Sequence, residues 1–120
     1  MIDSLRILGN IEIDFSMDKH LETLNPYIKL CIYKTIRESI TNGIKHGKAT
    51  TFKLKIGIHE NHVKLNIKNN GVGCDDIVRS NGLRGIEDRV LALGGTVDFN
   101  SPENSGFLTK SQIPIHEEMN

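Results

Sequence analysis

The sequence predicts a two-layer α/β sandwich, in which a mixed β-sheet is covered on one face by helices. The expected elements occur in the order strand, long helix, two strands, second helix and two strands, and strands interrupted by helices favour such a layered arrangement. Apolar residues alternate with polar ones in the strand segments and recur every three or four residues in the helical segments. The length of 120 residues is enough for one domain.

The first half of the chain contains one expected strand and the long helix. Residues 7–15 are expected to hold the strand, because Ile11, Ile13 and Phe15 alternate with polar residues. The helix begins at Asn25-Pro26, with an asparagine cap and a proline in the first helical position, and ends at Gly47. Its apolar stripe is expected to consist of isoleucines at every fourth position: Ile28, Ile32, Ile36, Ile40 and Ile44.

The second half contains a hairpin, a second helix and two final strands. Alternating residues 52–58 and 63–67 are expected to pair across a turn at 59–62, and the second strand leaves into a glycine-containing turn at 69–73. A polar loop at 74–81 precedes a helix that stops at Gly94-Gly95. Strands at 96–100 and 107–115 surround a turn at 102–106.

Charge and cysteine content narrow the class of protein. Fifteen basic and 15 acidic residues cancel, so the composition gives no reason to expect nucleic acid or direct membrane contact. No apolar run approaches the length of a membrane span. Cys31 and Cys74 lack metal-ligand spacing and are expected to be reduced thiols in a cytoplasmic protein.

One face of the long helix carries residue types that suit a metal–phosphate ligand. Glu38 and Asn42 are four residues apart, and Lys45 lies one turn further on the same face. An amide oxygen can bind Mg²⁺, a carboxylate can orient or deprotonate a nucleophile, and a lysine can meet phosphate charge. A solvated helix face is the alternative interpretation of the same three residues.

Two glycine pairs allow a ligand to approach the backbone. Gly71 and Gly73 follow a strand, and they permit close approach or a plain turn. Gly82 and Gly85 open the second helix, where free N–H groups and the helix dipole attract phosphate. An ordinary helix start would also explain the second pair.

In combination these segments resemble the ATP-binding catalytic domain of sensor histidine kinases. Residues 38–49 are similar to the N-box of that domain. Residues 82–90, followed by 93–95, resemble the segment after the ATP lid in the short-lid subfamily of nitrate-sensor and thermosensor kinases. The likeness covers about residues 11–114. It implies the Bergerat ATP-binding fold shared by gyrase, Hsp90, histidine kinases and MutL.

The resemblance also implies roles for single residues. Asn42 would ligate Mg²⁺, and Glu38 would assist transfer of the γ-phosphoryl group of ATP to a histidine. Lys45 and His46 would lie near the phosphates, and Asn69, Gly71 and Gly73 would belong to the adenine loop. The residues implied to hold phosphate oxygens at the start of the second helix are Gly82, Leu83, Arg84 and Gly85.

The chain departs from the family pattern at two positions. Asn69 stands where the family has an aspartate that accepts a hydrogen bond from the adenine amino group. A neutral acceptor is weaker than a charged one, which predicts a loss of affinity on the order of tenfold or more. Phe107 stands where the family usually has threonine, so that a hydroxyl group is lost.

The segment before Ile11 is too short for the helical dimerisation segment that bears the phosphoacceptor histidine. We therefore expect a monomeric domain that acts on a histidine of its parent protein or of a partner, and through it on a response regulator. Three alternatives stay open. They are a degenerate module with weak nucleotide binding, an anti-sigma-type serine kinase of the same fold, and a non-binding α/β domain.

Overall fold

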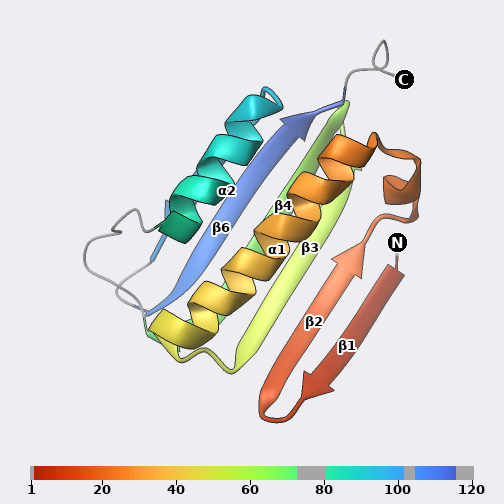
Figure 1. The fold of residues 1–120 in the computed structure, drawn as a ribbon. Helices are drawn as coiled ribbons and strands as arrows, with labels where there is room; N and C mark the ends of the chain where they lie inside the picture. The colour runs from red at the N-terminus through yellow and green to blue at the C-terminus, as the bar shows by residue number, and fades with distance from the viewer. Residues whose placement is uncertain (1, 73–80, 102–104, 116–120) are drawn as a thin grey trace.

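A computed structural model describes residues 2–72, 81–101 and 105–115. In these residues a six-stranded sheet has the strand order β1-β2-β3-β4-β6-β5, and helices α1 and α2 lie side by side on one of its faces (Figure 1). Strands β2 and β3 are parallel, whereas the other neighbouring strands are antiparallel. The sheet is therefore mixed, and the predicted two-layer α/β architecture is confirmed.

The elements have the following bounds. The strands are β1 Ile2–Leu8, β2 Ile11–Met17, β3 Thr51–His59, β4 His62–Val72, β5 Thr96–Asn100 and β6 Ser105–Pro114. The helices are the 3-10 helix η1 Lys19–Thr23 and the α-helices α1 Pro26–Gly47 and α2 Asn81–Ala92.

The N-terminal region differs from the prediction of one strand at 7–15. It forms a hairpin of β1 and β2 instead, in which Leu8 pairs with Ile11 across a turn. Gly9 adopts a positive φ of 63° there, a conformation that favours glycine and closes a tight turn. The Gly9-Asn10 pair is the sequence signal for this turn, whereas the prediction ran a single strand through it.

Helix α1 begins and ends as predicted, but its buried face follows the isoleucine stripe only in part: Ile28 and Ile32 are buried, and Ile36 and Ile40 pack against the core. The Asn25 side chain accepts the N–H of Tyr27 at 2.7 Å, and the helix ends at Gly47. Ile44 is 41% exposed, because every four-residue step turns the helix about 40° beyond a full rotation. Steps of three and four residues keep one face buried, and its residues are Ile28, Cys31, Ile32, Thr35, Ser39 and Gly43.

The predicted hairpin of β3 and β4 is confirmed, but β4 is longer than expected. Glu60 and Asn61 both have positive φ, as a type I′ hairpin turn requires. The predicted turn at 69–73 is wrong for its described part, because β4 continues to Val72. A bulge between Asn69 and Val72 shifts the register of β4 against β6, so the strand bends where the sequence suggested that it ended.

Helix α2 starts at Asn81 and ends before Gly94, which has a φ of 78°. Ile86 and Val90 are fully buried against the sheet. Strand β5 has its predicted bounds, and β6 begins two residues earlier than expected, so Gly106 lies in the strand. The predicted loop at 74–80 and residues 102–104 of the predicted turn lie outside the described residues.

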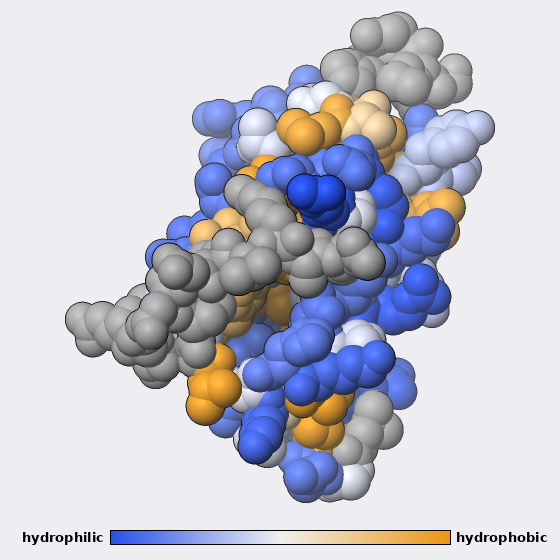
Figure 2. All heavy atoms as spheres, turned by 60° about the vertical axis from the view of Figure 1, so that its left-hand side comes forward, coloured by the Kyte–Doolittle hydropathy of each residue, from blue (hydrophilic) through white to orange (hydrophobic). Residues whose placement is uncertain are grey.

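The main core lies between the helices and the covered face of the sheet. Alternate residues of β3 and β4 point into it, among them Phe52, Leu54, Ile56, Val63, Leu65 and Ile67. The side of the molecule that carries α2 is mostly hydrophilic, with separate hydrophobic patches (Figure 2). None of the helices in the described part of the chain has the length and hydropathy that a bilayer span requires.

Candidate functional site

The C-terminal half of α1 presents Glu38 and Asn42 toward α2. Both side chains are partly buried, and they share one side of the helix because they are four residues apart. The amide nitrogen Nδ2 of Asn42 is buried and has no hydrogen-bond partner among the described residues. A buried amide nitrogen without a partner is costly, so a hydrogen-bond acceptor placed beside Nδ2 would stabilise this part of the protein.

Glu38 is held by an arginine that the sequence analysis did not select. Nη2 of Arg89 on α2 donates to Oε2 of Glu38 at 2.5 Å, and the two side chains are 27% and 26% exposed. Charge-assisted hydrogen bonds of this length are among the stronger ones in proteins. Nε of Arg89 is buried and unpaired within the described part of the chain. The sequence signal was weak, since Arg89 is one of several charged residues on an amphipathic helix.

The first turn of α2 lies next to this ion pair. A Cβ on Gly85 would lie 3.3 Å from Nη1 of Arg89 and 3.5 Å from Oε2 of Glu38, so the missing side chain leaves room for the pair. Leu83 is buried in the core and Arg84 is exposed, so Leu83 can meet a phosphate through its backbone alone. Gly82 also lies in this turn.

The two residues at the end of α1 that were predicted to lie near the phosphates are in the last helical turn. Lys45 and His46 are both exposed. The described residues also contain no cluster of three His, Cys, Asp or Glu side chains that could enclose a metal. A Mg²⁺ ion at Asn42 would therefore depend on phosphate oxygens and water for its other ligands, which is the coordination that Mg²⁺ commonly has in phosphate sites.

Asn69 lies on the helix-covered face of β4, beneath α1. Its Oδ1 accepts the backbone N–H of Gly71 at 2.9 Å, and its side chain is buried, with 9% exposure. Phe52 on β3 and Phe107 on β6 are its cross-strand neighbours. Phe107 also packs against Phe99, with 6.2 Å between the ring centroids. The position of the predicted base acceptor is therefore an amide between two phenylalanines.

Two glycines allow this end of β4 to approach α1. A Cβ on Gly71 would lie 2.6 Å from the carbonyl oxygen of Gly47, so Gly71 is required for packing of the strand end against the helix end. A Cβ on Gly43 would lie 2.6 Å from the Phe52 ring and 2.9 Å from Nδ2 of Asn69. Gly73, the remaining predicted site residue, lies outside the described residues.

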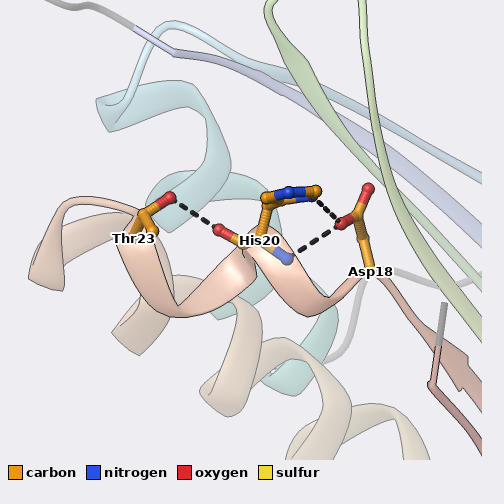
Figure 3. Close-up of polar contacts among 3 residues, drawn as sticks. All are labelled: Asp18, His20 and Thr23. Atoms are coloured by element: carbon orange, nitrogen blue, oxygen red, sulfur yellow. Dashed lines mark hydrogen bonds and ion pairs between the residues drawn. The ribbon is translucent and has the colours of Figure 1, made fainter.

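The opposite end of the helical layer has a different character. A groove of 500 Å³ lies there, lined by residues that include Leu24, Ile28, Ile58, Leu93 and Ile115. The 3-10 helix beside it is capped by Asp18, whose Oδ1 accepts the backbone N–H of His20 and contacts its ring Nδ1, both at 2.9 Å (Figure 3). The backbone hydrogen bond, together with the ring contact, lowers the pKa of the Asp18 carboxyl.

Cys31 also lies in the N-terminal half of α1, where it is a buried free thiol. Burial raises its pKa, which keeps the thiol protonated and unreactive. Structure therefore agrees with the prediction of a reduced, core cysteine at this position, whereas Cys74 lies outside the described residues.

Sequence comparison finds relatives among bacterial sensor kinases. The chain is 32% identical over 92 residues to the sensor histidine kinase ComP of Bacillus subtilis, a match that covers 72% of this chain and 12% of ComP. It is 28% identical over 115 residues to the histidine-protein kinase/phosphatase DegS of Bacillus subtilis, covering 89% of this chain and 30% of DegS. The chain thus spans less than a third of the length of these two relatives. No protein-family model matches it.

Solved structures with the same fold are also histidine kinases. A blue-light activated histidine kinase of Erythrobacter litoralis superposes with a TM-score of 0.77 at 18% identity, over 94% of this chain and 38% of that one. The ATP binding domain of PrrB from Mycobacterium tuberculosis superposes with a TM-score of 0.71 at 19% identity, over 92% of this chain and 84% of that one. In sequence and in fold, the chain belongs to the family of sensor histidine kinase ATP-binding domains.

Proposed function

We propose that the chain binds Mg-ATP and donates the γ-phosphoryl group to a histidine on a dimerisation domain, in its parent protein or in a partner. The observation that carries this proposal is the position of Asn42, which lies one helical turn from the Glu38–Arg89 ion pair and whose buried nitrogen Nδ2 has no partner among the described residues. An amide and a carboxylate next to the first turn of a helix suit a metal-bound triphosphate. A response regulator would receive the signal indirectly, in the cytoplasm.

Each site residue has a part in this proposal. Asn42 would ligate Mg²⁺, which neutralises phosphate charge during transfer. Glu38 would orient or deprotonate the attacking imidazole, and Arg89 would hold its carboxylate in place. The exposed Lys45 and His46 would attract the phosphates. Backbone groups at the start of α2, at Gly82, Leu83, Arg84 and Gly85, would hold phosphate oxygens near the positive end of the helix dipole.

Calorimetric titration with ADP and with a non-hydrolysable ATP analogue, each with and without Mg²⁺, tests the proposal. We expect micromolar to sub-millimolar binding that strengthens when Mg²⁺ is present, a range that allows for the weaker acceptor at Asn69. Nucleotide affinity that is the same with and without Mg²⁺ would contradict the role of Asn42.

A degenerate regulatory module of the same fold is the second candidate function. It is favoured by Asn69 and Phe107, which occupy the base end of the site in place of the residues usual in the family. This candidate predicts no binding of nucleotide at millimolar concentration, so the same titration separates the two.

A further inference from the structure

The base end of the site presents a hydrogen-bond donor where an adenine nucleotide needs an acceptor. We propose that Asn69 makes this site prefer a 6-oxopurine nucleotide, of the inosine or guanosine type, over an adenine nucleotide. The inference rests on the proposed function, in which Asn69 lies at the base end of the site. It names the class of nucleotide and makes Asn69 the residue that determines specificity.

The orientation of the Asn69 amide follows from its hydrogen bond to the backbone. Its oxygen Oδ1 accepts the Gly71 N–H at 2.9 Å, and a backbone N–H can donate to the oxygen of an amide but not to its NH₂ group. Gly71 lies in the bulge, where the pairing between β4 and β6 is interrupted. Rotating the amide by 180° would set two donors against each other and leave the buried Gly71 N–H unsatisfied.

The nitrogen Nδ2 is left for a ligand. It faces Gly43 of α1, where a Cβ would come within 2.9 Å, and the hydrogen bond that the Asn69 side chain makes to Gly71 uses Oδ1 and not Nδ2. Its cross-strand neighbours Phe52 and Phe107 are apolar. A free donor in such surroundings gains most from an acceptor on the ligand, because water competes less for it there.

The two purine classes differ at the atom that this donor would meet. Adenine carries an amino group at position 6, and this donor would face the Asn69 NH₂ without forming a hydrogen bond. A 6-oxopurine carries a carbonyl oxygen there and accepts. An aspartate at position 69 would behave in the opposite way, because one carboxylate oxygen would still accept the Gly71 N–H and the other would accept an adenine amino group.

The test is a calorimetric titration of the whole chain with Mg-ADP and Mg-IDP. These ligands differ at position 6 and in the proton on N1, while their sugar and phosphates are the same. We expect the wild-type chain to bind IDP about tenfold or more tighter than ADP, since a mismatched donor pair is replaced by a hydrogen bond. Asn69→Asp keeps the acceptor for Gly71 and should reverse the order.

Asn66→Asp is the matched control, because it makes the same chemical change on β4 at an exposed side chain. It should keep the wild-type preference. Wild-type chain that binds ADP as tightly as IDP, or an unchanged preference in Asn69→Asp, would overturn the inference and leave the proposed function intact. Failure of both nucleotides to bind at millimolar concentration would instead overturn the proposed function, and this inference with it.

Discussion

The two ends of the helical layer use their polar groups differently. At the end where α1 begins, the side chains of Asn25 and Asp18 accept backbone N–H groups of their own helix starts. In the half of α1 that leads to its C-terminal end, Nδ2 of Asn42 is buried without a partner among the described residues, and Nε of Arg89, the arginine that holds Glu38, is also unpaired there. Paired polar groups stabilise the fold, whereas unpaired buried groups cost stability, and we expect these two nitrogens to meet a ligand.

The largest expected effect is on chemistry at the unpaired end. Glu38→Gln keeps the shape of the side chain but removes the charge that would act on the attacking histidine. Transfer of labelled γ-phosphate from ATP to a supplied phosphoacceptor domain should fall about 10²- to 10⁴-fold, while nucleotide affinity changes only a few-fold. Glu12→Gln, on an exposed position of β2, is the control. Equal rates in the two variants would remove Glu38 from the mechanism.

The next effect separates binding from stability. Asn42→Ala should weaken the Mg²⁺-dependent part of nucleotide binding by about tenfold or more. Because Nδ2 of Asn42 is buried without a partner among the described residues, its removal takes away an unsatisfied donor, and the free energy of unfolding should not fall. Calorimetry and urea denaturation measure the two quantities. A large loss of stability with unchanged Mg²⁺ dependence would make Asn42 a structural residue.

Arg89→Met tests the link between the two helices. The variant removes the partner of a partly buried carboxylate, and it should lower the free energy of unfolding by about 1–3 kcal/mol. Arg37→Met is the control, since Arg37 is exposed and lies over the ring of Tyr33 on its own helix. Equal unfolding midpoints for the two variants would mean that the ion pair contributes no net stability.

A smaller effect is expected at the paired end. Asn25→Ala removes the N-cap of α1 and should destabilise the chain by about 1 kcal/mol. Nucleotide affinity should be unchanged, because the cap lies at the opposite end of α1 from Asn42. Asn25→Asp supplies another side-chain acceptor and should restore stability in urea denaturation. A cap variant that also lost nucleotide affinity would show that the two ends are coupled.

The smallest effect concerns pH. The pKa of Asp18 is lowered from its usual 3.8, first by the backbone N–H of His20 and then by the His20 ring. The contribution of the Asp18 carboxylate to folding stability is therefore present at pH values above its usual pKa. It is lost as the pH falls through the lower pKa of the folded state. Thermal melting of wild type and Asp18→Asn between about pH 7 and about pH 2 should show a small difference in melting temperature, which disappears at the acidic end. A difference that grows in acid would contradict this sign.

Local sequence patterns predicted most elements of the fold. The cap at Asn25, the stop at Gly47 and the alternation in β3 and β4 depend on residues a few positions apart, and each was found as expected. Patterns that depend on distant partners were less well predicted. The isoleucine stripe had a plausible spacing, but its drift around the helix leaves its last member, Ile44, exposed. The predicted strand was shorter than β4, because pairing with β6 continues β4 past Gly71.

Sequence patterns were enough to predict the order of the elements other than β1 and the 3-10 helix, the ends of α1, and the types of residue offered for a metal–phosphate ligand. Which of these residues meet depends on how the helices pack on the sheet. Arg89 and Glu38 are 51 positions apart and pair because both helices pack on one face of the same sheet. The direction of the Asn69 amide was likewise decided by the bulge that turns the Gly71 N–H toward it. Local propensity acts over a few residues, whereas such contacts depend on where packing places whole elements.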